Sequence, residues 1–284
     1  MSAPGRASPA TGGVAADGPV IAARRAGEVR RREPAPRPAA ARWPADGAAE
    51  KALLTAGVLA LWLAVYFGAA RLADPARAAS LRTGLDDRIP FVPRAIWLYA
   101  TVYTAMLLPI FTVRPVGAFR RVAAAYTATI LVSGAVFVAF PVTAVGFRPD
   151  VSRFGDGALH LWGLRLAFFL DPPVNLFPSL HLSIATLAAL ASWSVRRAYG
   201  ALAGLLALAI AAAVLLVKQH FWLDAVAGVA LGAVAWALFV RPRVRRGEGA
   251  AYGWAGPASY VAFHASALLA AAALWSAGVR PWAQ

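Results

Sequence analysis

Two short motifs combine histidine with residues that suit phosphate chemistry. Residues 177–181 read Phe-Pro-Ser-Leu-His, and residues 218–224 read Lys-Gln-His-Phe-Trp-Leu-Asp. His220 and Asp224 are four residues apart, so on a helix they share one face and can form a hydrogen bond. A carboxylate on one ring nitrogen fixes the tautomer of a histidine and leaves the other nitrogen as a nucleophile. The second motif therefore favours attack on phosphorus. The simpler alternative is a histidine and an aspartate that satisfy each other at a helix end.

The first motif has the pattern of an anion-binding helix start. Proline favours the first helical position, so Pro178 predicts free amide donors at Ser179 and Leu180. The Ser179 hydroxyl is another donor, and His181 lies one turn into the helix, within reach of the same anion. Taken alone, the motif fits a plain helix start with an incidental histidine equally well.

Phosphoryl transfer also needs positive groups around the phosphate oxygens, and Arg148 and Lys218 are the basic residues beside the motifs. Asp171 and Asn175 closely precede the first motif and are candidates for shaping the loop or contacting a substrate headgroup. The four histidines are scattered, with no thiol or glutamate at ligand spacing, and make a poor zinc set. We therefore expect no metal and no other cofactor.

The composition is that of an integral membrane protein. Hydrophobic residues make up 60% of the chain and charged residues only 14%, and the mean hydropathy is +0.60. The absence of cysteine excludes disulfides and thiolate metal sites. A net charge of +15 suggests nucleic acid, but the arginines lie in an N-terminal tail and in linkers between apolar segments, as at the cytoplasmic side of a membrane. The expected partners are therefore the bilayer and a membrane lipid phosphate, not nucleic acid, and the oligomeric state stays open.

The chain divides into three parts. Residues 1–47 are rich in Ala, Pro, Gly and Arg and are expected to form a disordered basic cytoplasmic tail. Residues 48–240 are expected to form a catalytic membrane domain, and residues 241–284 a basic loop with an additional C-terminal transmembrane helix. Seven apolar stretches approach the ~20 residues that a spanning helix needs. They are Ala52–Ala70, Ala95–Val113, Val122–Val145, Ser179–Val195, Tyr199–Val217, Trp222–Val240 and Ala258–Gly278.

Basic residues set the expected orientation. A cytoplasmic N-terminus also places the linkers Arg114–Arg121, Arg196-Arg197 and Arg241–Arg246 inside. Both histidine motifs then fall on the outer face. We expect a multi-pass protein of a bacterial inner (plasma) membrane, with its site on the periplasmic or extracellular side.

The motifs together resemble the type 2 phosphatidic acid phosphatase superfamily, and particularly its inositol phosphorylceramide synthase-like branch. The family's second motif matches Pro178-Ser179-Leu180-His181, whose leucine is typical of that branch. Its third motif ends in the His220 and Asp224 pair, and its first ends in Arg148-Pro149. The resemblance covers about Ile89 to Gly232 and implies an all-α membrane fold, with a six-helix core and a probable seventh helix.

The resemblance also implies roles for individual residues. His220 would be the nucleophile that forms a phosphohistidine, with Asp224 orienting it, and His181 would protonate the leaving oxygen and then activate the acceptor. The residues implied in holding the phosphate without a metal are Arg148, Lys218, Ser179 and the local amides, including that of Leu180.

Two family positions differ in this chain. Pro141 stands where the first motif has a lysine, and Ala213 and Val214 stand where the third motif has Ser-Arg. The synthase-like branch shows the same losses. Lys218, two residues before the histidine, is the expected substitute for a missing cation.

The expected function is that of a lipid phosphate phosphatase or phosphotransferase. Hydrolysis would use water as acceptor, and transfer, as in an inositol phosphorylceramide synthase-like enzyme, an alcohol such as inositol or a glycan. A non-enzymatic transporter is the alternative of a different class. It predicts polar residues spread through the spans and internal repeats, whereas these stretches are nearly pure Ala, Leu and Val.

Overall fold

The computed structural model describes residues 47–284 except 156, 243, 245–249 and 283–284. The expected tail, up to residue 46, and part of the basic run after residue 240 lie outside the described residues. Over the described part of the chain every regular element is helical, and extended backbone occurs only as isolated bridges. The predicted all-α membrane fold is confirmed.

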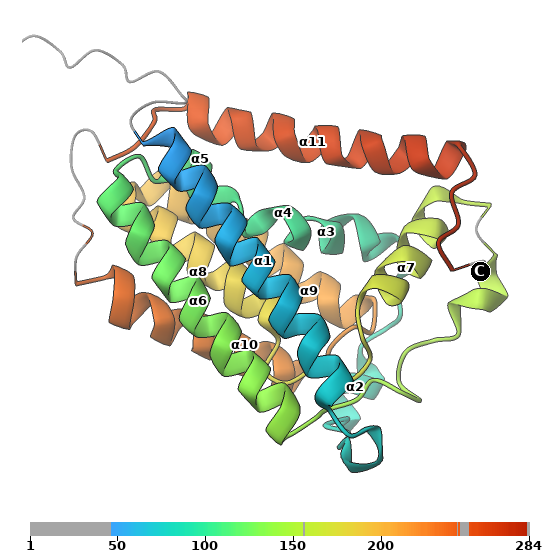
Figure 1. The fold of residues 1–284 in the computed structure, drawn as a ribbon. Coiled ribbons are helices and arrows are strands. Elements are labelled where there is room, and N and C mark those ends of the chain that lie inside the picture. The colour runs from blue at the N-terminus through green and yellow to red at the C-terminus, as the bar shows by residue number, and fades with distance from the viewer. Residues whose placement is uncertain (1–46, 156, 243, 245–249, 283–284) are drawn as a thin grey trace, which may run out of the picture. The chain divides into compact units, whose positions relative to one another are not determined.

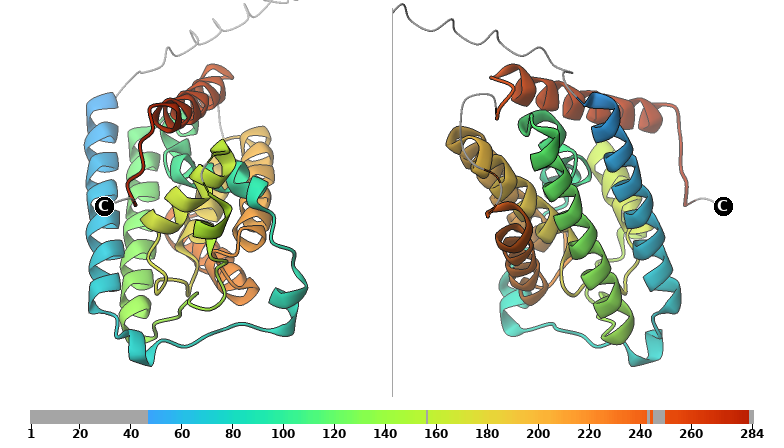
Figure 2. Two further views of the ribbon diagram at one scale, coloured as in Figure 1. Left: turned by 90° about the vertical axis from the view of Figure 1, so that its right-hand side faces the viewer. Right: turned by 60° about the vertical axis from the view of Figure 1, so that its left-hand side comes forward.

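Five helices within the described residues are long and apolar enough to cross a membrane. The chain is therefore a multi-pass membrane protein. The five are α1 (Ala48–Leu72), α6 (Val116–Ala139), α9 (Arg197–Leu216), α10 with its π-helical continuation (Trp222–Val240) and α11 (Ala255–Ser276). In every view of Figures 1 and 2, α1 lies beside α6, and the two helices pack against each other.

The predicted second span is broken, which corrects the expectation of one helix over residues 95–113. After the 3-10 turn η2 (Pro93–Ala95) it consists of α3 (Ile96–Ala100), α4 (Val102–Ala105) and α5 (Leu108–Thr112). Pro109 has no amide to donate, and its ring crowds the carbonyl four residues earlier, which belongs to the last residue of α4. The Thr101 hydroxyl donates to the Leu98 carbonyl at 2.6 Å, a local bond that competes with the regular helix.

Two other predicted spans also differ from the structure, one in position and one in length. Helix α6 begins and ends six residues earlier than expected. The predicted fourth span is α8 (Leu180–Val195), whose 16 residues are fewer than a crossing helix needs. Most of α8 is buried, and it packs against α9, α10 and α6. A helix enclosed by protein does not have to match the thickness of the hydrocarbon, so α8 serves as the centre of the bundle.

Glycines let α10 approach α8 closely. A Cβ at Gly228 would overlap the Ser179 carbonyl oxygen, and one at Gly232 would overlap the Ser183 carbonyl oxygen. Small residues four apart are a common way for membrane helices to bring their backbones together. This contact fixes the start of α8 against the first turns of α10, where the two histidine motifs lie.

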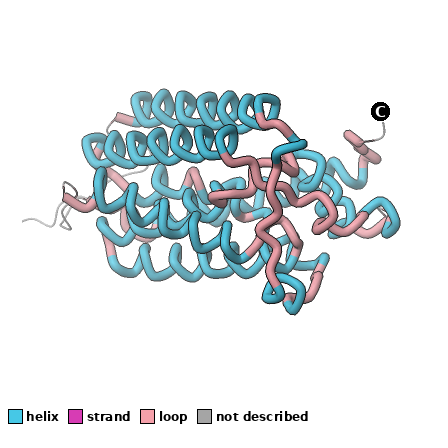
Figure 3. Tube along the Cα trace, turned by 90° about the horizontal axis from the view of Figure 1, so that it is seen from below, coloured by secondary structure: helices cyan, strands magenta, loops and turns pink. Residues whose placement is uncertain are grey.

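Loops gather at one end of the bundle (Figure 3). Three of them pair side by side through parallel bridges from Val142 to Ala79 and to Asn175. The Thr143 amide donates to the Ala79 carbonyl at 2.9 Å, and the Ala144 amide to the Pro173 carbonyl at 2.8 Å. The short elements of these loops are η1 (Pro75–Arg77), α2 (Gly84–Arg88), η3 (Val151–Phe154) and α7 (Leu159–Leu170).

The opposite end of α8 meets the basic linkers. Arg120 forms an ion pair with Glu50 at the start of α1. The buried ammonium of Lys51 donates to the Val113 carbonyl at 2.9 Å. The Arg196 guanidinium lies over the Trp254 ring. These basic linkers and the first histidine motif thus lie at opposite ends of α8.

The contact between α8 and α10 predicts an unusual response to substitution. Gly228→Ala should destabilise the protein by about 1–3 kcal/mol, because the added methyl overpacks the interface. Alanine normally stabilises a helix relative to glycine by about 1 kcal/mol. A loss of stability on Gly228→Ala would therefore come from the overlap with α8 and not from helix propensity. Gly204→Ala on α9 is the matched control, since a Cβ there meets nothing within 4 Å. Thermal unfolding in detergent measures both, and equal or higher stability of Gly228→Ala would contradict the close contact.

Candidate active site

The two histidine motifs meet at the loop-rich end of the bundle. His181 Nδ1 and His220 Nε2 are 3.0 Å apart, and the two ring centroids are 5.3 Å apart. His220 Nδ1 lies 3.4 Å from Asp224 Oδ2. His220 and Asp224 are buried, and the side chain of His181 is 11% exposed. The structure thus brings these three predicted residues into one continuous polar array.

Asp224 ties three parts of the site together. Its Oδ2 accepts the Phe221 amide at 2.9 Å, and its backbone carbonyl accepts the Ser179 amide at 3.0 Å. The carboxylate therefore caps the start of α10 while facing the His220 ring, and the carbonyl joins α10 to the start of α8. Burial lowers the pKa of His220, although the Asp224 carboxylate acts in the opposite direction. A neutral His220 with its proton on Nδ1, facing Asp224, presents a lone pair at Nε2.

The turn that carries His220 ends α9 in a Schellman-type arrangement. The Lys218 amide donates to the Leu215 carbonyl at 3.2 Å, and the Gln219 amide to the Val214 carbonyl at 2.9 Å. Lys218 takes the left-handed position of this motif, with φ of 59°, where glycine is usual. A non-glycine residue in that conformation costs about 1–2 kcal/mol, so the lysine side chain must provide something that glycine lacks.

The Lys218 side chain anchors the turn to the outer loop. Its ammonium donates to the Asp86 carbonyl at 2.7 Å and the Ile89 carbonyl at 2.6 Å, and it lies over the Phe147 ring. None of its described contacts is with either histidine. This placement does not support the predicted role of Lys218 as a phosphate ligand, because two of the three ammonium protons are used by protein carbonyls that hold the side chain in the outer loop.

Helix α2 supports the same turn from the other side. The buried Asp86 carboxylate accepts the Trp222 amide at 2.9 Å, at the first position of α10. The Trp222 indole donates to the Thr83 hydroxyl at 2.9 Å. The turn from Lys218 to Trp222 is therefore held at both ends by α2. Sequence reasoning missed this role of Asp86, since nothing local relates it to a residue more than a hundred positions later.

The start of α8 differs in detail from its prediction. The helix begins at Leu180, and Ser179 is its N-cap, whose hydroxyl accepts the Leu182 amide at 3.4 Å. The Ser179 amide is not the free donor expected, because it donates to Asp224. An amide of the first helical turn, such as that of Leu180, has no partner within the helix and is suited to an anion.

Asp171, in the loop before the first motif, is the centre of a second buried polar group. Its carboxylate accepts hydroxyl protons from Tyr66 at 3.1 Å, Tyr99 at 2.5 Å and Tyr103 at 2.8 Å. His181 Nε2 lies 3.7 Å from the same carboxylate. Burial raises the pKa of Asp171, but the neighbouring imidazole and the hydrogen bonds together hold it below its usual value. The sequence offered one signal for this group, since Tyr99 and Tyr103 are four residues apart and share a face of an apolar stretch.

Arg148 is the basic side chain that the described contacts place nearest this array. Its Nη1 donates to the Asp171 carbonyl at 2.8 Å, and the guanidinium lies over the Phe168 ring. Its buried Nε has no partner within the described structure. Arg148 also acts electrostatically on both Asp171 and His220. It is positioned to compensate negative charge at the histidines.

The residues at the two altered family positions have packing roles. The Pro141 carbonyl accepts the Ala79 amide at 2.9 Å within the paired loops. Val214 is fully buried, and its carbonyl accepts the amides of Gln219 and His220. Pro141 and Val214 thus form loop and turn contacts that shape the site, and neither residue carries a charge.

The site is thus a buried His-Asp array at one end of a membrane helix bundle. A family model described as the PAP2 superfamily matches residues 77–238, which is more than half of the chain. The chain belongs to the PAP2 superfamily, and this membership indicates a phosphatase-type enzyme. No curated protein and no solved structure matches significantly.

The placement of Lys218 predicts an effect on stability. Lys218→Met removes the bonds to the Asp86 and Ile89 carbonyls but keeps the strained backbone, so the free energy of unfolding should fall by about 1–3 kcal/mol. Lys218→Gly also removes those bonds but relieves the left-handed backbone, so it should be less destabilising than Lys218→Met. Thermal unfolding and steady-state kinetics of both variants provide the measurement.

A phosphate ligand would behave differently in the same experiment. Both variants would then keep the stability of the wild type and raise KM to a similar degree. That outcome would restore the role expected from the sequence.

Proposed function

We propose that the protein is a lipid-phosphate phosphatase or phosphotransferase that forms a phosphohistidine at His220. The observation that supports this most strongly is the arrangement of the His220 ring. Its Nδ1 faces Asp224 and its Nε2 faces His181. A neutral imidazole held in this way is an activated nucleophile with an acid-base group directly in front of it.

Two steps complete the proposed reaction. The His220 Nε2 lone pair forms a bond to phosphorus while the bond from phosphorus to the leaving oxygen breaks, and that oxygen takes a proton from His181. An acceptor oxygen, from water or an alcohol, then attacks phosphorus and gives its proton to His181, and the bond to His220 breaks. Arg148 and a first-turn amide of α8 supply positive potential for the phosphate oxygens.

Substrate binding requires the two rings to separate. Reacting atoms approach to about 3–3.5 Å before attack, and the leaving oxygen lies beyond phosphorus in an in-line displacement. The 3.0 Å between the histidine nitrogens is too short to hold a phosphoryl group. Because His181 is the more exposed of the two, we expect its ring to move when the substrate binds.

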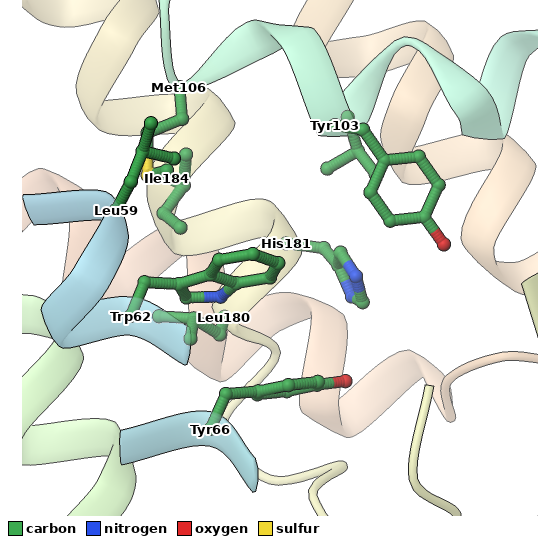
Figure 4. Close-up of a pocket in the computed structure, with 9 residues that line it drawn as sticks. Leu59, Trp62, Tyr66, Tyr103, Met106, Leu180, His181 and Ile184 are labelled. Atoms are coloured by element: carbon green, nitrogen blue, oxygen red, sulfur yellow. The ribbon is translucent and has the colours of Figure 1, made fainter. Parts of the chain in front are cut away.

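A cavity beside His181 suits a hydrocarbon chain. It has a volume of about 120 Å³ and lies between α1, α4 and α8. In Figure 4 the His181 ring lies between Tyr66 and Tyr103, with Trp62 and aliphatic side chains filling the other side. An apolar chain in this cavity would place its phosphate near the two histidines, and this favours a lipid over a soluble phosphate ester. The residues that line the cavity are Leu59, Trp62, Tyr66, Val102, Tyr103, Met106, Leu180, His181 and Ile184.

A transferase of the inositol phosphorylceramide synthase type is the second candidate. Arg148 is the one basic side chain whose described contacts reach the Asp171 and histidine array, and both altered family positions lack a charge. Such a site matches the single negative charge of a phosphodiester better than the two charges of a monoester. Purified protein assayed with lipid phosphomonoesters, pyrophosphates and phosphodiesters, with and without inositol or a glycan, separates hydrolysis from transfer.

The proposed mechanism makes His220 indispensable. His220→Ala should lower turnover of a radiolabelled lipid phosphate by several orders of magnitude, because no other described group holds the nucleophile position. Wild-type enzyme quenched with SDS at alkaline pH should contain a phosphoenzyme that is stable in alkali and lost in acid, and the variant should lack it. His160→Ala in α7 is the matched control and should retain both activity and phosphoenzyme.

Two results would contradict the mechanism. One is a phosphoenzyme of normal yield in His220→Ala. The other is full loss of wild-type activity in EDTA with recovery on adding a divalent ion, which would indicate a metal-dependent site.

We also propose that the site faces the outer side of a bacterial inner membrane. Because the chain has no cysteine, single cysteines can report topology without a background. Ser152→Cys, in the loop after Arg148, should react with a membrane-impermeant maleimide in intact spheroplasts. Gly117→Cys, beside the basic linker before α6, should react only after the membrane is permeabilised. Both positions are exposed in the structure, and the reverse labelling pattern would place the site inside.

A further inference from the structure

The Asp171 carboxylate makes more polar contacts than a loop-shaping role requires. It is 3% exposed and accepts protons from three tyrosines that come from α1, α3 and α4. The side-chain amide of Gln219, in the turn that carries His220, lies 3.5 Å from Asp171 Oδ2. Among the described residues the imidazole that it faces is His181, at 3.7 Å, which is an ion-pair distance rather than a hydrogen bond.

The Tyr99 hydroxyl reports which His181 nitrogen carries hydrogen. It lies 2.5 Å from Asp171 Oδ2 and 3.3 Å from His181 Nε2. A hydroxyl has one proton, and the shorter contact to a carboxylate uses it. Tyr99 therefore presents a lone pair to His181, and a lone pair needs an N–H partner. This arrangement favours a proton on Nε2 of His181.

The other His181 nitrogen must carry hydrogen as well. His220 keeps its proton on Nδ1 to face Asp224, so its Nε2 is an acceptor. His181 Nδ1 lies 3.0 Å from that acceptor, and only an N–H can complete the contact. With protons on both nitrogens, His181 is an imidazolium, and Asp171 is the anion beside it.

We propose that Asp171 is the positioning carboxylate of His181, which keeps Nε2 protonated and stabilises the imidazolium so that Nδ1 is the acid that protonates the leaving oxygen. This inference rests on the proposed function and assigns a distinct carboxylate to each histidine. Asp224 holds His220 neutral as the nucleophile, and Asp171 holds His181 charged as the acid.

The proton balance follows from this assignment. As His220 bonds to phosphorus, the leaving oxygen keeps the electron pair of the broken bond and takes the Nδ1 proton of His181. His181 is then neutral, with hydrogen on Nε2 facing Asp171 and Tyr99. When the acceptor oxygen attacks, its proton returns to Nδ1, and the pair of the breaking bond returns to His220. Asp171 keeps its negative charge throughout.

The charged and titratable groups around His181 are all accounted for within the described residues. Tyr103 stacks edge-on against its ring, and Tyr66 lines the cavity beside it. Arg148 binds the Asp171 backbone carbonyl, and its positive charge acts on the Asp171 carboxylate. Asp224 reaches His181 only through His220.

Leaving-group dependence separates an acid role from a structural one. The full chain in lipid-detergent micelles is given two phosphomonoesters that differ in the leaving oxygen, a diacylglycerol phosphate and a p-nitrophenyl phosphate whose ring carries an alkyl chain. The aryl oxygen departs without protonation, whereas the alkyl oxygen needs it. Asp171→Asn should lower kcat for the alkyl substrate by about a hundredfold or more, the range of general acid catalysis. Its effect on the aryl substrate should be at least about tenfold smaller, with KM for both changed far less than kcat.

The pH profile gives a second reading. In Asp171→Asn the alkaline limb of kcat/KM for the alkyl substrate should move to lower pH, because the imidazolium has lost its anion. The acid limb, which reports His220, should stay in place. Asp171→Glu should restore part of the alkyl activity. Asp87→Asn is the matched control, an exposed carboxylate paired with Arg82, and should change neither substrate.

Nitrogen-15 NMR of histidine-labelled wild type tests the charge state without any variant or turnover. At pH 7 the His181 ring, assigned with His181→Gln, should show two protonated nitrogens and the His220 ring one. A neutral His181 would overturn the inference even if Asp171→Asn failed to fold. Equal losses for both substrates, with an unmoved pH profile, would also overturn it and leave Asp171 a structural residue. A wild type inactive on every phosphate ester would instead overturn the proposed function, while the NMR result still decides the charge of His181.

Discussion

The two carboxylates of the histidine array, Asp171 and Asp224, are buried at the loop-rich end of the bundle and impose the main constraint on this structure. An uncompensated buried charge costs several kcal/mol, so each carboxylate needs donors supplied by the protein itself. On Asp224 the Phe221 amide and the His220 ring both approach Oδ2, while the buried Oδ1 has no hydrogen-bond partner among the described residues. Asp171 accepts protons from three tyrosine hydroxyls. Because those tyrosines come from separate helices, satisfying Asp171 also fixes how α1, α3 and α4 meet.

The histidines depend on that framework for their geometry. Gly228 and Gly232 bring α10 against α8, and the backbone bond from Ser179 to Asp224 sets the register of the two helix starts. Helix α2 then holds the intervening turn through Asp86, whose carbonyl binds Lys218 and whose carboxylate binds the Trp222 amide. A catalytic group displaced by about 1 Å can lose two orders of magnitude in rate, which gives this bracing a functional consequence.

Much of the framework could be predicted from local sequence. Long runs of Ala, Leu and Val identified the five long helices, although two further runs that were expected to span form a broken segment and a 16-residue helix. The four-residue spacing of His220 and Asp224 implied their contact. The break near Pro109 has a local cause that sequence reasoning overlooked. The role of Lys218 had no local signal, because whether its ammonium reaches a phosphate or a carbonyl depends on where residues 86–89 fold back. The partners of Asp171 were out of reach for the same reason, since its tyrosines lie 68 to 105 positions away.

The charge balance of the array explains how the altered family positions are tolerated. Pro141 and Val214 are committed to loop pairing and to the His220 turn, so neither position supplies a cation. In the proposed mechanism an imidazolium at His181, held by Asp171, contributes one positive charge at the reacting atoms, and Arg148, bound to the Asp171 carbonyl, contributes a second. The site therefore carries a cation that is also its acid. His181 loses its positive charge when the leaving oxygen takes its proton, and the neutralised oxygen then departs. A fixed lysine or arginine holds a phosphate more strongly but keeps its charge after the transfer. The histidine arrangement therefore binds phosphate less tightly and releases the product more easily.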